Sequence, residues 1–190
     1  MKRSATLAVW LCLAVATPAL AQYSKQAPKP PAGGYTAAQK AQMAKGLTPD
    51  AAFVIAASQS VYAGATFAKM ALEKASSADV KRLARQAADA NERLSEELKP
   101  LLKAQKAPEP AALDQRNQAV GEWLAKLSGA EFDRAYMSNL AASKANEVML
   151  FGRAADLAHD AALKGWASKN LPTIKQQQES AMAINKKLTH

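Results

Sequence analysis

The sequence predicts an all-α fold, a four-helix bundle with one additional short helix. Apolar residues recur at spacings of three and four along four long segments after residue 48, and this spacing is typical of one face of an α-helix. β-branched residues are few and nowhere alternate with polar ones over the length of a strand, so no sheet is expected. The first 21 residues differ in composition and are predicted to lie outside the bundle.

Those first residues have the pattern of a secretory signal peptide. Lys2 and Arg3 precede an apolar run over residues 7–16, and the triplet Ala-Leu-Ala at 19–21 places small residues before a cleavage site at Gln22. We therefore predict a cleaved signal peptide and a mature protein that is exported to the periplasm.

A predicted leader joins the signal peptide to the bundle. Residues 22–47 contain several prolines and glycines and few large apolar side chains, so they are predicted to be flexible. The bundle itself is predicted over residues 48–188. Cys12, the single cysteine, falls within the signal peptide, so the mature chain has no disulfide, no thiolate nucleophile and no cysteine metal ligand.

The first long helix is predicted to begin at Thr48. Threonine is a favoured N-cap, Pro49 suits the first helical position, and the carboxylate of Asp50 complements the positive end of the helix dipole. The stripe that follows consists of small and aromatic residues, namely Phe53, Ala57, Ser60, Gly64, Phe67 and Ala71.

A second helix is predicted from Ser77, and Pro100 is expected to bend or end it. A loop over residues 106–110 and a shorter third helix follow, and Ser128-Gly129 is expected to separate that helix from the next one. The predicted apolar stripes are Val80, Leu83, Ala87, Ala90, Leu94, Leu98 and Leu101 in the second helix and Val120, Trp123, Leu124 and Leu127 in the third.

The fourth and fifth predicted helices complete the bundle. A kink is expected in the fifth at Pro172. Their stripes are Phe132, Tyr136, Leu140, Val148, Phe151 and Ala155 in the fourth helix and Leu163, Trp166, Leu171, Ile174, Ala181, Ile184 and Leu188 in the fifth.

The charge of the chain indicates a solvated basic surface. Removal of Lys2 and Arg3 with the signal peptide lowers the formal net charge from +9 to +7, and the basic residues are scattered among acidic ones without a run. No basic stripe carries interleaved aromatic residues, so no nucleic-acid partner is expected. No segment after the signal peptide has about 18 unbroken apolar residues, so no membrane span is expected. The candidate partners are a protein, an envelope polymer, a small molecule or further copies of this chain.

Several polar residues lie on or beside the apolar stripes, one or more on each long helix. They form a candidate inner polar layer, consisting of Ser60, Asp89, Asn91, Lys144, Glu147 and Gln177. Asp89 and Glu147 are the expected counter-charges for Lys144. Two interpretations remain open. In one, these side chains flank the stripes and keep their ends in water. In the other, they form a buried hydrogen-bonded layer that fixes helix register or lines a small binding cavity.

Short segments in a fixed order carry a resemblance to a known family. They are residues 132–137 (FDRAYM), residues 171–175 (LPTIK) and, in the second helix, Val80-Lys81, Asp89 and residues 96–99 (EELK). Together they resemble the exported, ferritin-like bacterial family called domain of unknown function 4142 (DUF4142), over roughly residues 51–188. The resemblance implies a ferritin-like bundle in the periplasm and implies no defined activity.

The chain departs from that family at its characteristic polar positions. Typical members carry histidines on the second, fourth and last helices and carboxylates on the first. By this resemblance the histidine positions hold Asn91, Lys144 and Gln177, the carboxylate positions hold Gly64 and Thr66, and Asp89 is retained. The mature chain has two histidines, His159 and His190, and no Glu-x-x-His pair, whereas a metal site in a helical bundle needs several such ligands. No metal and no cofactor are therefore expected.

No enzyme chemistry is expected either. The sequence has no nucleophile elbow, no histidine placed to activate a serine and no glycine-rich phosphate loop. The prediction is a non-enzymatic, exported, envelope- or stress-associated bundle that binds a partner or small ligand. The alternative implied by the resemblance is a ferritin-like metal-binding or storage protein, or a metal-dependent oxidoreductase.

Overall fold

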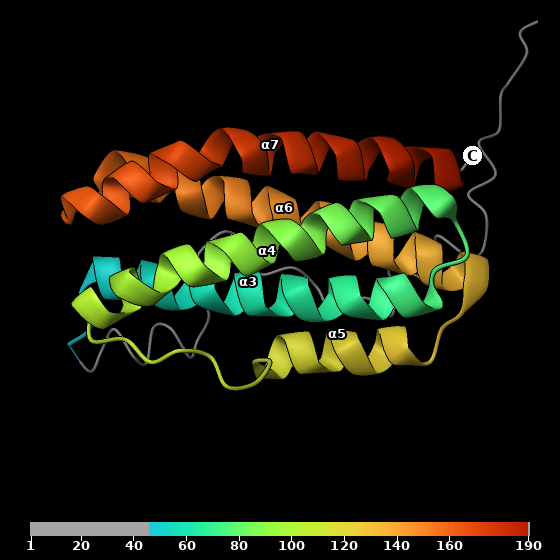
Figure 1. Ribbon diagram of the computed structural model, residues 1–190, viewed down its shortest axis with the longest axis horizontal. Coiled ribbons are helices and arrows are strands. Elements are labelled where there is room, and N and C mark those ends of the chain that lie inside the picture. The colour runs from blue at the N-terminus through green and yellow to red at the C-terminus, as the bar shows by residue number, and fades with distance from the viewer. Residues whose placement is uncertain (1–45, 190) are drawn as a thin grey trace, which may run out of the picture.

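A computed structural model describes residues 46–189, and this part of the chain forms a helical bundle without strands. Its helices are α3 (Pro49–Lys74), α4 (Ala78–Ala104), α5 (Gln115–Ala125), α6 (Gly129–Leu157) and α7 (Ala161–Thr189). The four long helices lie lengthwise beside one another, and the short α5 lies along one side of the bundle next to α3 (Figure 1). The all-α prediction is confirmed. The predicted signal peptide, residues 22–45 of the leader and His190 lie outside the described residues.

Two helical hairpins make up the bundle. α3 packs along α4, and α6 packs along α7, while α3 also contacts α6 and α4 contacts α7 (Figure 1). Each hairpin has a tight connection, at residues 75–77 between α3 and α4 and at residues 158–160 between α6 and α7. Such short connections are typical of antiparallel neighbours in four-helix bundles.

The start of the first helix follows the sequence prediction. Thr48 is the N-cap of α3, its Oγ1 accepts a hydrogen bond from the backbone N–H of Ala51 at 3.1 Å, and Pro49 is the first helical residue. Pro100, in contrast, does not end α4, which runs on to Ala104. A proline inside a helix costs one backbone hydrogen bond, and the burial of Leu98, Leu101 and Leu102 around it offsets that loss.

Two buried aspartates fasten the ends of the bundle. Asp133, near the start of α6, accepts hydrogen bonds from the backbone N–H groups of Ser76 and Ser77 at 3.1 and 2.8 Å and from the Ser76 hydroxyl at 2.5 Å. Asp50, in the first turn of α3, accepts hydrogen bonds from the backbone N–H groups of His159 and Asp160, the shorter at 2.8 Å. Each hairpin therefore contributes a carboxylate that holds the turn of the other hairpin.

The apolar core is divided into two clusters along the bundle. The cluster near the α3–α4 turn contains Phe67, Leu83, Phe132, Tyr136 and Ile184. The other cluster lies near the α6–α7 turn and contains Phe53, Leu98, Phe151, Trp166 and Ile174. In the second cluster the rings of Phe53, Phe151 and Trp166 pack together with centroids 5.0 to 6.3 Å apart.

α3 passes a length and composition test for a membrane-spanning helix, a result that the sequence prediction did not anticipate. The core helix of a soluble bundle passes the same test, because its apolar residues face the protein interior. Twelve of the 26 residues of α3 are buried against the other helices, including Val54, Phe53 and Phe67.

Candidate binding groove

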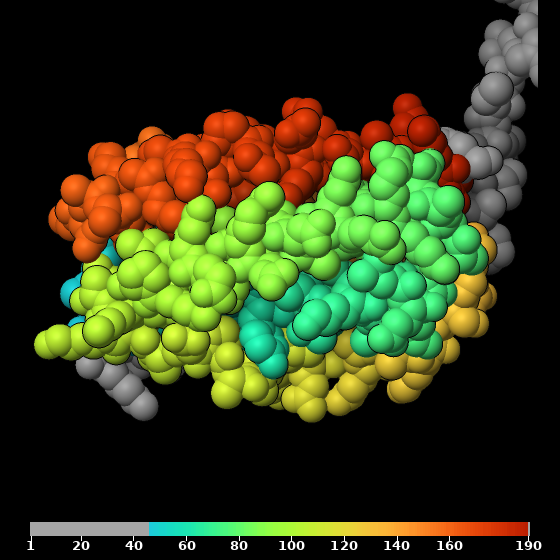
Figure 2. All heavy atoms as spheres, in the orientation of Figure 1, coloured from blue at the N-terminus to red at the C-terminus, as the bar shows by residue number. Residues whose placement is uncertain are grey.

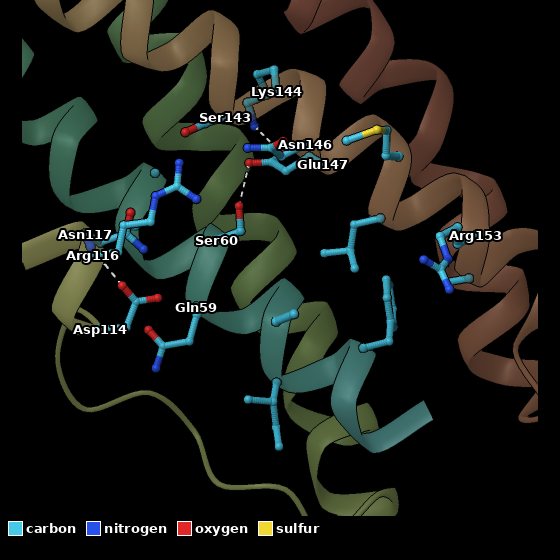
Figure 3. Close-up of a pocket in the computed structure, with 18 of the residues that line it drawn as sticks. Gln59, Ser60, Asp114, Arg116, Asn117, Ser143, Lys144, Asn146, Glu147 and Arg153 are labelled. Carbon is cyan, nitrogen blue, oxygen red and sulfur yellow. Dashed lines mark hydrogen bonds and ion pairs between the residues drawn. The ribbon is translucent and has the colours of Figure 1, made fainter. Parts of the chain in front are cut away.

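A chain of hydrogen bonds links three members of the predicted inner polar layer. The hydroxyl of Ser60 on α3 donates to Oε1 of Glu147 on α6 at 2.8 Å, and the ammonium of Lys144 donates to Oε2 of the same carboxylate at 2.7 Å. Figure 3 shows both bonds. Lys144 and Glu147 are three residues apart, so α6 places both side chains on one face.

Both charges of this pair are buried. Lys144 and Glu147 are each 3% exposed, so the interpretation in which the Lys144 ammonium stays in water is wrong. An ammonium has three N–H groups, and among the described residues Glu147 is the one acceptor recorded for Lys144. Two N–H groups of a buried cation are therefore left for another acceptor.

Asn91 and Gln177 extend the polar layer toward α4 and α7. Asn91 is 1% exposed and packs against Gly64 of α3, so closely that a Cβ added at Gly64 would lie 2.7 Å from Nδ2 of Asn91. The side-chain oxygens of Asn91 and Gln177 are buried and accept no hydrogen bond from the described residues. Along each helix these positions fall between the residues of the two apolar clusters.

Asp89 does not belong to the layer, and its predicted role as a counter-charge for Lys144 is corrected. Its side chain is exposed on α4. Residues two apart on a helix point to widely different directions, so burial of Asn91 turns Asp89 toward solvent. Glu147 supplies the counter-charge instead.

The buried pair lies at the wall of a groove between α3, α5 and α6 (Figure 3). Its volume is about 820 Å³, which is in the range of small-molecule sites. α4 and α7 form much of the face seen in Figure 2, with parts of α3 and α5 below α4, and neither α4 nor α7 contributes a residue to the groove lining. The lining is mostly apolar, with Ser60, Ser143, Lys144 and Glu147 as its central polar residues.

The groove has two halves of different character. Toward the α3–α4 turn, α5 packs beside α3 and covers the groove, and Phe67, Val120 and Leu140 line this part. Toward the α6–α7 turn none of the described helices covers it. The lining there includes Ile55 and Leu150, together with Met149 and Leu157, which are exposed large apolar residues of α6.

Arg116 lies between the covered and the uncovered half of the groove. It lies in the first turn of α5, is half-buried and forms no ion pair with another described residue. Its guanidinium points into the groove, toward the side on which Ser143 and Lys144 lie (Figure 3). Asp114, nearby, caps α5 by accepting the backbone N–H of Asn117 at 2.8 Å.

Tyr136 adds a further donor at the covered end of the groove. Its side chain is 1% exposed, and its hydroxyl makes no hydrogen bond to the described residues. Burial raises the pKa of the Tyr136 phenol, so the group remains a neutral hydrogen-bond donor at physiological pH.

The donor set at the groove does not fit a metal ion. Within residues 46–189 no three histidine, cysteine, aspartate or glutamate side chains are grouped so that they could hold one. At the positions where the family resemblance implies histidines, the structure places a buried ammonium and two amides, Lys144, Asn91 and Gln177. A lysine ammonium has no lone pair to donate to a metal, and its positive charge repels a cation.

Sequence reasoning missed most of the groove. The sequence indicates Ser60 and Lys144 because each falls on an apolar stripe, and it indicates Glu147 as a counter-charge for Lys144. No such signal marked Arg116, Ser143 or Tyr136. An arginine on a short helix is expected to be solvent-exposed, and a tyrosine on an apolar stripe is expected to belong to the core. Arg116 becomes notable only when α5 is placed over α3 and α6.

These features define the class of the protein as an all-α helical bundle with a polar layer and a side groove. The family called "Domain of unknown function (DUF4142)" matches residues 35–184, and the chain belongs to this family. The match confirms the resemblance seen in the sequence. No curated protein and no solved structure matches the chain. The ferritin-like description of the bundle stays a prediction.

Proposed function

We propose that this protein is an exported, non-enzymatic binding protein that holds a small amphipathic molecule in the groove between α3, α5 and α6. One observation carries the proposal, namely that a mostly apolar groove of about 820 Å³ has a buried, incompletely hydrogen-bonded charge pair in its wall. A pocket with mainly apolar lining and a few convergent polar groups is the usual form of a small-molecule site.

A purely structural role explains the charge pair less well. A buried ion pair contributes little net stability, because desolvation of the two charges offsets their attraction. Apolar residues at 144 and 147 would join the two core clusters and stabilise the fold at least as well. The polar pair is more readily explained by the presence of a ligand with polar atoms.

Export is the second part of the proposal. It rests on the pattern of the first 21 residues, and it predicts that the mature chain begins at Gln22. N-terminal sequencing of the protein recovered from the periplasm of the producing cell tests this. An N-terminus at Met1 in a cytoplasmic fraction would contradict it.

Binding is tested with the fluorescent apolar amine N-phenyl-1-naphthylamine, added to the mature chain. We expect a saturable increase in fluorescence at one site. Ala56 lines the groove, so Ala56→Trp fills it and should abolish the increase. Ala142→Trp is the matched control, because Ala142 is exposed on α6 and does not line the groove. Equal binding by both variants would place the probe elsewhere and contradict the proposal.

A further inference from the structure

The polar groups of the groove are unequally divided between donors and acceptors. Among the charged and the most buried groups of the groove, the donors left without a partner in the described residues are two N–H groups of Lys144 and the guanidinium of Arg116, with the Tyr136 hydroxyl further along. Ser143, Asn139 and Asn146 also line the groove, and their side chains can both donate and accept. The unmatched buried acceptor that lines the groove is Oε1 of Gln59. A ligand that satisfies the two cationic groups must therefore bring acceptors.

The positive charge of the donors further restricts the class of ligand that the groove can bind. Glu147 neutralises Lys144 and already accepts hydrogen bonds at both of its oxygens. Arg116 forms no ion pair within the described residues, and the carboxylate of Asp114, which also lines the groove, caps α5 instead. A planar guanidinium in a half-buried position binds a carboxylate through two parallel hydrogen bonds, and this is the geometry for which arginine is best suited.

The position of these donors along the groove sets the orientation of the ligand. Ser60, Lys144 and Glu147 lie in the middle of the groove, and Arg116 points toward them from the start of α5 (Figure 3). The uncovered half beyond them is lined by Ile55, Leu150 and the exposed Met149 and Leu157. An apolar chain laid along this half would remove exposed methionine and leucine side chains from water.

We infer that the ligand is a single-chain carboxylic acid, with its carboxylate between Arg116 and Lys144 and its apolar chain along the uncovered half of the groove. This inference rests on the proposed binding function and specifies its ligand class. No bond is made or broken, because binding of the acid as its carboxylate needs only the donors already present.

The test compares two probes that share one apolar chain. Decanoate carries a carboxylate and decanol a hydroxyl, and each is titrated into the mature protein by calorimetry below its aggregation concentration. We expect decanoate to bind about ten- to hundred-fold more tightly than decanol, which is the range of a charge-assisted hydrogen-bonded pair.

Two arginine variants test whether Arg116 binds the carboxylate of decanoate. Arg116→Gln should weaken decanoate binding by about ten-fold or more and leave decanol binding unchanged. Arg85→Gln is the matched control, since Arg85 is exposed on α4, away from the groove, and the substitution makes the same change of charge. It should change neither affinity.

The outcomes separate this inference from the proposed function. Equal affinity for decanoate and decanol, both lost in Ala56→Trp, would overturn the carboxylate inference and leave the binding function standing. Equal weakening of decanoate binding by Arg116→Gln and Arg85→Gln would likewise overturn the inference alone. Failure of both probes to bind the unmodified protein would overturn the inference and the binding function together.

Discussion

The ends of the bundle and its middle both bury polar groups, but these groups are fully hydrogen-bonded at the ends and only partly in the middle. At the ends, Asp133 is 1% exposed and Asp50 is 7% exposed, and both carboxylates accept backbone hydrogen bonds from the opposite hairpin. In the middle, Lys144 has one acceptor for three N–H groups, and the amide oxygen of Asn91 has no donor among the described residues. Buried groups of the first kind stabilise the fold, whereas those of the second kind cost stability.

Under the proposed function, the polar groups at the ends serve the fold and those in the middle serve binding. The two aspartates find all their partners within the chain, so the fold alone accounts for them. In the middle layer, the Lys144 ammonium completes its hydrogen bonds only when another molecule supplies acceptors. The groove beside Lys144 is where such a molecule would enter.

The largest effect is expected at the ends. Asp133→Ala removes three hydrogen bonds and leaves the backbone N–H groups of Ser76 and Ser77 without their acceptor. The free energy of unfolding, measured with urea, should fall by about 4 kcal/mol. Asp156→Ala is the control, because Asp156 is exposed near the end of α6, and it should change stability by less than about 0.5 kcal/mol. Similar losses in the two variants would contradict the claim that the hydrogen bonds of Asp133 stabilise the fold.

Removal of one partner from the buried pair should have the next largest effect. Glu147→Leu leaves the Lys144 ammonium buried without a counter-charge and the Ser60 hydroxyl without its acceptor. We expect a loss of about 3 kcal/mol in urea unfolding. The exposed pair Glu96–Lys99 has the same spacing, and Glu96→Leu should leave stability unchanged within error. A negligible effect of Glu147→Leu would show that the pair is solvated.

A smaller loss of stability is expected when a methyl group is added at Gly64, where α3 contacts Asn91. A methyl group at Gly64 would lie 2.7 Å from Nδ2 of Asn91, so Gly64→Ala should destabilise the protein by about 1.5 kcal/mol. Gly152, also within a helix, has no neighbour within 4 Å of an added Cβ. Gly152→Ala should therefore stabilise by about 0.5 to 1 kcal/mol. Stabilisation by both changes would mean that Asn91 moves freely and that the middle layer is not closely packed.

The smallest effect concerns the exposed edge between α4 and α7 and depends on pH. A hydrogen bond from Lys169, helped by those from Asn170 and Trp166, lowers the pKa of Glu97. A lowered pKa in the folded state adds stability above the unfolded value of about 4.5, and this contribution is lost as the pH falls below it. Glu97→Gln should thus be slightly less stable than the unmodified protein at pH 7, and the difference should be smaller at pH 3. A difference that is as large at pH 3 would contradict this assignment.

The sequence predicted the parts of the structure that depend on local pattern. The five helices follow from their apolar spacing, and the cap at Thr48 follows from its residue type. Ser60 and Lys144 were recognisable as polar residues on apolar stripes, and Glu147 as a counter-charge that Lys144 would need. Asp133 was not recognised, because a carboxylate next to an apolar stripe does not indicate which groups it binds.

The remainder depends on contacts between segments far apart in the chain. The bonds from Asp50 and Asp133 cross between hairpins, and no spacing within one helix indicates them. The groove exists because α5 covers part of the space between α3 and α6. Its position, and with it the role of Arg116, is set by tertiary packing.

One measurement tests most directly whether the middle layer serves binding. The double variant Lys144→Met/Glu147→Leu replaces the buried charges with apolar side chains of similar size, and its melting temperature is compared with that of the unmodified protein, with and without decanoate. We predict that the double variant melts at the same or a higher temperature without ligand, because apolar packing replaces a costly ion pair. We also predict that decanoate raises the melting temperature of the unmodified protein and not that of the variant. A variant that melts well below the unmodified protein and is still stabilised by decanoate would contradict the account.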